Sequence, residues 1–239
     1  MSFGQPLIHY MVCDSTNEEA RQLAATGFPS GTVVTADDQR EGRGRTGRKW
    51  FSKPGTTLLY SAILRPLEPK HGLLPLAVPI AVAEAAESVT SVSCQLKWPN
   101  DVWIDGLKCA GVLIEARPED GWAVIGVGLN VSTANKDFPA GLRKTAASLG
   151  AKVEVADARD ALNERLPHWI EAGESEVLAA FEERDALRGR EIAWGEGEGK
   201  AEGIDEKGNL LVKTAGGERV SLGAGEVQLA PLSGGDPEP

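Results

Sequence analysis

The first two thirds of the chain alternates short apolar runs with longer segments of helical periodicity. Apolar runs of strand length lie at residues 31–36, 56–65, 94–98, 110–117 and 121–131. The last two flank residues 118–121, which predicts a hairpin. Residues 17–26 carry apolar side chains at helical spacing, with Asp14 or Ser15 as the cap and Gly27 at the end. This pattern predicts helices packed on a sheet.

Two further segments predict helices. Residues 73–92 are rich in Ala, Leu and Val, and their two prolines fall near the start, where a helix tolerates proline best. The most apolar part of this segment is too short and too interrupted by proline to span a membrane. Residues 157–185 also have helical character. We expect Asp157 to cap that helix and Pro167 to kink or split it.

The pattern changes after residue 186. Turn residues recur at 195–199, 205–209 and 216–217, between short alternating runs such as 209–213. This spacing predicts a small β-barrel of four or five strands. Residues 233–239 have the composition of a disordered tail. We therefore expect a large domain over 1–185, a small β domain over 186–232 and a disordered tail over 233–239.

Composition narrows the class of protein. The chain has 239 residues, 41% hydrophobic and 25% charged, as in ordinary globular proteins. Its net charge of -10 argues against a general DNA-binding or membrane-binding function. The three cysteines and three histidines show no spacing typical of a disulfide framework or a metal site. With no signal-peptide pattern at the N-terminus, these features predict a cytoplasmic protein.

A cationic, glycine-rich segment stands out within residues 37–55, which are expected to form a long loop. Residues 42–50 read GRGRTGRKW. The spacing fits the dinucleotide-binding G-x-G-x-x-G, but Pro54 and Gly55 prevent the helix that must follow it. Glycines would let the backbone approach a ligand, and arginines would bind carboxylate or phosphate oxygens. A solvated surface loop or a nonspecific nucleic-acid patch remains an alternative.

Joining a carboxylate to ATP brings two anions together. At about 4 Å they repel by roughly 4 kcal/mol at an effective dielectric near 20. Lys108 opens a strand of small and apolar residues and is a candidate for offsetting this charge, although an exposed strand-end lysine is the commoner case for such a residue taken alone. Asn100 and Asp101 follow Pro99 and either bind a metal–phosphate group or simply cap a turn.

The glycines and asparagine of residues 126–130 and the three tryptophans each allow a ligand-binding or a purely structural interpretation. Gly126 and Gly128 allow a ligand or another strand to approach, and Asn130 either binds a ribose or phosphate or is satisfied within the sheet. The three tryptophans near these motifs either wall a ligand ring or pack in the core, which is the commoner use. They are Trp50, Trp98 and Trp103.

Five motifs occur in a fixed order along the chain. They are Asp14-Ser15-Thr16-Asn17, Gln39-x-x-Gly42-Arg43-Gly44-Arg45-x-Gly47-Arg48-x-Trp50, Lys97-Trp98-Pro99-Asn100-Asp101, Lys108-x-Ala110-Gly111-Val112-Leu113-Ile114-Glu115 and Gly126-x-Gly128-Leu129-Asn130. Together they resemble the catalytic region of biotin–protein ligases, motif by motif over residues 8–131 and in general pattern over 186–230. Any one motif is weak evidence, whereas the ordered set is specific.

The resemblance implies a fold and a reaction. The fold is an α/β (α+β) catalytic domain of the class II aminoacyl-tRNA-synthetase type, with a mixed sheet and flanking helices, followed by an SH3-like β-barrel. In the reaction, biotin and MgATP give biotinyl-5′-AMP and pyrophosphate, and a lysine of a biotin carboxyl carrier protein then displaces AMP. The ligase type implied lacks a DNA-binding module, since only about seven residues precede Ile8. Monomers and homodimers both remain open.

The resemblance also implies site residues. Biotin binding is assigned to Ser15, Thr16, Asn17, Gln39, Arg43, Gly44, Arg45 and Lys108. Nucleotide binding is assigned to Arg43, Arg45, Arg48, Trp50, Asn100, Asp101 and Asn130, with Asp101 as a ligand of ATP-bound Mg²⁺. Lys108 and Arg43 are the catalytic candidates. No side chain in 132–156 is assigned to cover the adenine. A lipoate–protein ligase and a non-catalytic sensor of biotin or its adenylate remain alternatives.

Overall fold

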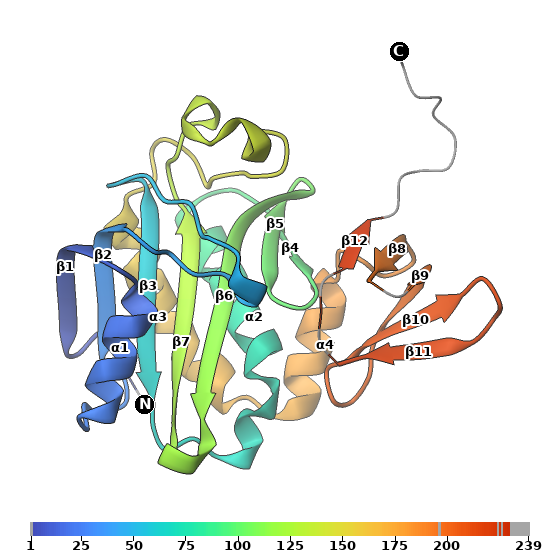
Figure 1. Ribbon diagram of the computed structural model, residues 1–239, viewed down its shortest axis with the longest axis horizontal. Coiled ribbons are helices and arrows are strands. Elements are labelled where there is room, and N and C mark those ends of the chain that lie inside the picture. The colour runs from blue at the N-terminus through green and yellow to red at the C-terminus, as the bar shows by residue number, and fades with distance from the viewer. Residues whose placement is uncertain (1, 196, 224, 226, 230–239) are drawn as a thin grey trace.

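The larger part of the chain forms a seven-stranded mixed sheet with helices on both faces (Figure 1). The computed structural model describes residues 2–195, 197–223, 225 and 227–229, so the predicted tail at 233–239 lies outside the described residues. The strand order is β1-β2-β3-β7-β6-β5-β4. The strands are β1 (Leu7–Cys13), β2 (Val33–Gln39), β3 (Thr57–Leu64), β4 (Cys94–Lys97), β5 (Asp101–Ile104), β6 (Leu107–Arg117) and β7 (Trp122–Asn130). Only the β1–β2 pair is parallel among the described pairs, which confirms the predicted mixed sheet.

Alternate side chains of the central strands enter two cores. On one face, Val34, Ile63 and Val124 pack against α1 (Thr16–Ala25). On the other face, neighbouring residues of the same strands pack against the longer helices α2 (Leu74–Val89) and α3 (Val155–Glu171). Because both faces are covered, every position of β3 is buried, as its continuous apolar run predicted.

The helix α2 fills the centre of the larger core. The segment Pro69–Val89 is long and apolar enough to cross a membrane, but 67% of its most apolar window is buried inside the protein. The segment begins with a short 3₁₀ turn over Pro69–Leu73, and Pro75 lies in the first turn of the helix, where its missing N–H costs nothing. It is therefore a core helix, as the sequence predicted.

The prediction for residues 157–185 was partly wrong. The segment forms two helices, α3 and α4 (Glu174–Arg184), but Glu154 rather than Asp157 occupies the cap position of α3. Asp157 lies inside the first turn, where the helix dipole favours a carboxylate. Pro167 does not end α3, because Leu166, Trp169 and Ile170 bury one face of the helix across it. The break falls instead at residues 172–173.

Two strands were not predicted. β1 forms one edge of the sheet beside β2, and β5 has only four residues. β5 begins at Asp101, directly after the turn at Pro99–Asn100, and pairs with β4 and β6. The turn therefore leads straight into a strand that places Asp101 opposite Gly111.

The C-terminal part forms a five-stranded antiparallel sheet, which confirms the predicted number of strands. They are β8 (Glu191–Trp194), β9 (Gly197–Ile204), β10 (Leu210–Thr214), β11 (Arg219–Leu222) and β12 (Val227–Leu229), in the order β11-β10-β9-β8-β12. The Trp98 indole N–H donates to the Gly208 carbonyl at 3.0 Å, and Leu73 and Leu76 contact Gly208. These contacts join the small sheet to the larger part, beside which it lies in Figure 1.

Candidate active site

A cavity of about 600 Å³ opens above the central strands, and residues from every predicted motif line it. Its lining includes all the residues assigned from the sequence: Ser15, Thr16, Asn17, Gln39, Arg43, Gly44, Arg45, Arg48, Trp50, Asn100, Asp101, Lys108 and Asn130. Segments far apart in the sequence therefore meet at one place, which is the size of a small-molecule site.

The floor of the cavity contains two strand positions without side chains. Gly126 and Gly128 lie two residues apart on β7 and so face the same side of the sheet. A Cβ on Gly126 would lie 2.1 Å from Asn17 Oδ1, and a Cβ on Gly128 would lie 2.4 Å from Trp50 Cε2. The glycines admit the protein's own side chains, whereas the sequence suggested only a ligand or another strand.

One end of the cavity is polar and neutral. Gln39 Oε1 accepts hydrogen bonds from the Thr16 backbone N–H at 2.7 Å and from the Thr16 hydroxyl at 3.0 Å. Thr16 and Asn17 begin α1 after the cap residue Ser15, and all three are buried. The first turn of the helix thus directs short polar side chains to this end, where they suit a neutral polar head group.

The cationic segment folds back on itself over the cavity. The Trp50 backbone N–H donates to the Gly42 carbonyl at 2.9 Å, and the Gly44 N–H donates to the Arg48 carbonyl at 2.7 Å. Thr46 takes the left-handed backbone conformation at φ 53°, and Gly47 follows at φ 76°. This tight turn leaves the arginine side chains to project in different directions.

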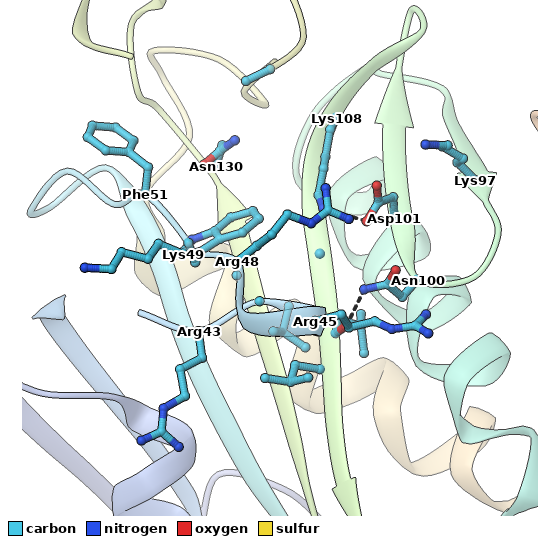
Figure 2. A pocket seen from close by; sticks show the side chains of 18 of the residues that line it. Arg43, Arg45, Arg48, Lys49, Phe51, Lys97, Asn100, Asp101, Lys108 and Asn130 are labelled. Atoms are coloured by element: carbon cyan, nitrogen blue, oxygen red, sulfur yellow. Dashed lines mark hydrogen bonds and ion pairs between the residues drawn. The ribbon is translucent and has the colours of Figure 1, made fainter. Parts of the chain in front are cut away.

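Figure 2 shows the consequence for the arginines. Arg48 extends toward Asp101 and Lys108, whereas Arg43 is directed away from them. Arg43 is exposed and pairs with Glu18 at 3.4 Å. Burial lowers the pKa of Arg45, and Asp101 acts in the opposite direction. Of the two catalytic candidates, Arg43 therefore lies apart from Arg48 and Lys108, whereas Lys108 lies beside Asp101.

Lys108 and Asp101 form an ion pair at the other end of the cavity. Lys108 Nζ lies 2.6 Å from Asp101 Oδ1, and their side chains are 34% and 17% exposed. Lys108 Nζ also lies 5.6 Å from the centre of the Trp50 ring, within range of a cation–π interaction. The ammonium group is thus positioned between a carboxylate and an aromatic face at the cavity wall.

The two asparagines assigned to nucleotide binding each donate to the backbone. Asn100 Nδ2 donates to the Val112 carbonyl at 2.7 Å, and Asn130 Nδ2 donates to the Ala147 carbonyl at 3.1 Å. Their side-chain oxygens are left as the groups that a ligand would meet. Asn130 is buried, so it also ties β7 to the segment after it.

Sequence analysis missed several lining residues. The segment between β7 and α3 contributes Phe138, Leu142, Lys144, Thr145 and Ala146, and the C-terminal sheet contributes Val227, Gln228 and Leu229. No side chain in 132–156 was assigned to a ligand from the sequence, whereas in the structure Phe138 lines the cavity with its ring 6.0 Å from that of Phe51. An aromatic or leucine in this segment would have been the signal for a wall of the cavity.

Lys97 is the first residue of one of the five motifs, but the resemblance assigns no role to it. Its Nζ lies 5.3 Å from the centre of the Trp103 ring. Burial lowers the pKa of Lys97, Asp101 raises it, and Lys108 and Arg48 lower it. Trp98 and Trp103 are both largely buried, which favours the packing interpretation for them over a ligand contact.

Charge is unevenly distributed around the cavity. The basic side chains that line it are Arg43, Arg45, Arg48, Lys49, Lys97, Lys108 and Lys144. Among the described residues that line it, Asp101 is the acidic one. On a chain of net charge -10, this concentration of positive charge marks a binding site for an anion.

The donor set does not make a metal site built from protein alone. The described residues contain no group of three or more His, Cys, Asp or Glu side chains placed to hold a metal. Asp101 offers one carboxylate and Asn100 one amide oxygen. Such a pair fits Mg²⁺ that is held mainly by phosphate oxygens and water.

Comparisons with known proteins agree with this geometry. Residues 10–132 match the biotin/lipoate A/B protein ligase family, and residues 188–230 match the biotin protein ligase C-terminal domain. The chain is 35% identical to a bifunctional ligase/repressor BirA of Bacillus spizizenii over 232 residues, 90% of this chain and 71% of that protein. It is 33% identical to a biotin–(acetyl-CoA-carboxylase) ligase of Mycobacterium tuberculosis, over 89% of this chain and 85% of that one.

The fold matches solved structures as well. The biotin protein ligase from Aquifex aeolicus in complex with biotin and ATP superposes with a TM-score of 0.78 at 31% identity, covering 94% of this chain and 99% of that chain. An apo structure of the Aquifex aeolicus ligase gives a TM-score of 0.74 at 28% identity, over 94% of this chain and 98% of that one. Both parts of the chain are therefore shared with these proteins.

Proposed function

Because the chain belongs to the biotin/lipoate A/B protein ligase family, we propose that it joins biotin to a lysine of a biotin carboxyl carrier protein. It is an ATP-dependent ligase that forms a carbon–nitrogen bond through biotinyl-5′-AMP and releases pyrophosphate and then AMP. The observation that carries this proposal is one cavity with a neutral polar end at Thr16 and Gln39 and a cationic end that contains Lys108. The relatives that are named as biotin ligases favour biotin over lipoate.

The first step joins two anions. An oxygen of the biotin carboxylate attacks the α-phosphorus of ATP, and the bond to pyrophosphate breaks. We assign the ureido end of biotin to Thr16 and Gln39, and the carboxylate to Lys108. Lys108 would then leave Asp101 for the carboxylate and α-phosphate oxygens, where its charge offsets the negative charge that builds up. Arg45 and Arg48 add to the same positive field.

The second step transfers the acyl group. The neutral amine of the carrier lysine attacks the acyl carbon, the C–N bond forms, the bond to AMP breaks, and the amine proton passes to solvent. A mixed anhydride is hydrolysed if water enters, so the intermediate must be covered. We assign this role to the segment 42–50, with Arg43 turning inward from its position beside Glu18.

Trp50 and the segment after β7 complete the nucleotide end of the proposed site. The Trp50 ring lies on Gly128, and Asn130 follows two residues later on the same face. Phe138, from the segment after β7, is a second aromatic side chain in the cavity lining. We infer that the adenine lies between these apolar walls, because bases stack on aromatic side chains.

Magnesium belongs to the proposal as the companion of ATP. Asp101, with Asn100 beside it, would hold the ion together with phosphate oxygens. When bound, Mg²⁺ neutralises phosphate charge and helps pyrophosphate to leave. Once Lys108 moves to the reacting groups, the Asp101 carboxylate is available to the ion.

The remaining expectations are also proposals. We divide the chain into a catalytic domain over 1–185 and a C-terminal domain over 186–232, in agreement with the two family matches. The free thiols of Cys13, Cys94 and Cys109 fit a cytoplasmic location. The acidic net charge disfavours a role on DNA or on an anionic membrane. A monomer and a homodimer both remain open.

The decisive experiment measures both steps with the full chain. Pyrophosphate release is followed with biotin and MgATP, and then transfer of labelled biotin to a carrier domain is measured with and without ATP. We expect ATP-dependent labelling of one carrier lysine. Pyrophosphate release with lipoate but not with biotin would identify a lipoate ligase. Binding of biotin without pyrophosphate release would identify a sensor.

A further inference from the structure

Two polar side chains lie behind the neutral end of the cavity without belonging to its described lining. Ser61 is on β3 and fully buried, and Glu115 is on β6 and partly buried. The Ser61 hydroxyl donates to Asn17 Oδ1 at 2.6 Å, and Asn17 Nδ2 donates to Glu115 Oε2 at 2.8 Å. Both ends of the Asn17 amide are therefore bonded to the protein, although Asn17 was assigned from the sequence to biotin.

The register of the sheet explains how one amide joins two distant strands. Ser61 pairs with Gly126, and Gly126 pairs with Leu113, so the three residues form one row across β3, β7 and β6. A Cβ on Gly126 would collide with Asn17 Oδ1 at 2.1 Å. The bare glycine thus lets the Asn17 amide lie on the sheet and connect Ser61 on one side with Glu115 on the other.

Glu115 and, at a longer distance of 3.4 Å, the Leu113 carbonyl fix the direction of this amide. Their oxygens accept from the nitrogen of Asn17 and so turn its oxygen to Ser61. The Ser61 hydroxyl also lies 2.8 Å from Thr16 Oγ1, and the Thr16 backbone N–H donates to Gln39 Oε1 at 2.7 Å. A continuous set of contacts therefore runs from Glu115 through Asn17, Ser61 and Thr16 to Gln39.

This hydrogen-bonded network ends at the side-chain amide of Gln39, which would contact a ligand. With Oε1 of Gln39 held by Thr16, its amide nitrogen is turned toward the cationic segment, where a Cβ on Gly42 would lie 3.1 Å from it. A ureido ring presents a carbonyl acceptor and two N–H donors in fixed positions. Recognition of such a ring requires that each protein donor and acceptor keep one orientation.

We propose that Glu115 and Ser61 are positioning residues that set the orientation of Thr16 and Gln39 through Asn17, and so determine affinity for the ureido ring of biotin. The inference deepens the proposed function and rests on it. It assigns Asn17 to orienting its neighbours rather than to contacting the ligand. Among the described residues, none of the hydrogen bonds in this network involves Lys108, Asp101, Asn100 or Asn130 at the nucleotide end.

The test compares three variants of the full chain in the pyrophosphate-release assay. Glu115→Leu removes the acceptor, Glu115→Gln keeps an acceptor oxygen, and Glu119→Leu is the matched control, since Glu119 is an exposed carboxylate just beyond β6. We expect Glu115→Leu to raise KM for biotin about ten-fold or more, because a buried donor is left unsatisfied. KM for ATP should stay within about two-fold, and Glu115→Gln should stay within about three-fold of the parent for both substrates.

The outcomes separate the possibilities. An unchanged KM for biotin in Glu115→Leu, or an equal rise in both KM values, would overturn the inference. Equal loss in Glu115→Gln and Glu115→Leu would also overturn it, because charge rather than hydrogen-bond orientation would then matter. If Glu115→Leu does not fold, Ser61→Ala tests the same chain, with a biotin-specific rise of a few-fold expected. Failure of the parent protein to use biotin would refute the proposed function instead.

Discussion

Replacing Lys108 with alanine should abolish most adenylate formation while leaving the fold intact. The side chain is 34% exposed, and its main partner is Asp101 at 2.6 Å. Partly exposed ion pairs contribute about 1 kcal/mol or less, so the melting temperature should fall by only a few degrees. Removing a donor that faces developing negative charge typically costs about 100- to 1000-fold in kcat. We expect a loss of this size in pyrophosphate release.

The comparison with other variants distinguishes catalysis from stability. Lys152→Ala, at an exposed lysine outside the cavity lining, is the matched control and should behave as the parent. The double variant Lys108→Ala with Asp101→Asn removes the unpaired carboxylate and should recover stability without recovering activity. Normal pyrophosphate release by Lys108→Ala would refute the assigned role. Recovery of activity in the double variant would show that Lys108 serves only to neutralise Asp101.

Three further outcomes are expected. Arg43→Gly should let biotinyl-AMP escape, seen as indiscriminate biotin labelling of added proteins, and tight retention of the intermediate would contradict this. Gly128→Ala should displace the Trp50 ring and raise KM for ATP about ten-fold, whereas Gly72→Ala, where nothing lies within 4 Å, should not. Burial raises the pKa of Cys13 from 9.0 to about 11, so its thiol stays protonated in the folded chain while the unfolded chain ionises. Its contribution to stability is therefore lost as pH rises from about 9 to 11, which denaturation across that range would measure.

The sequence predicted elements whose side-chain pattern is set by burial. β3 reads as a continuous apolar run because helices cover both of its faces, and α1 shows one apolar face because it lies on the sheet surface. The hairpin of β6 and β7 was readable from its turn residues at 118–121. Elements of this kind can be predicted from the sequence because burial of their own faces sets the local pattern of apolar and polar residues.

Contacts between residues of different strands and helices could not be predicted from the sequence. Nothing near Gly126 indicates that Asn17 covers it, because their meeting depends on how α1 packs over β7. Glu115 likewise looks like an ordinary residue near a strand end until its bond to Asn17 is known. The four-residue strand β5 was too short to give a periodic signal, and the contribution of β12 to the cavity depends on how the C-terminal sheet is placed.

The charge around the cavity depends both on local sequence motifs and on how distant segments pack together. The motifs predicted cations in the loop, but the structure adds Lys97 and Lys144 from other segments and gathers them around one carboxylate, Asp101. Burial lowers the pKa of Arg45 and Lys97, Asp101 opposes this effect, and neighbouring cations add to it. An acyl-nucleotide or ATP would supply the missing negative charge, and the same cations would then stabilise it. The excess of partly buried positive side chains over Asp101, the acidic residue of the described lining, therefore accounts for the proposed affinity for an anionic intermediate.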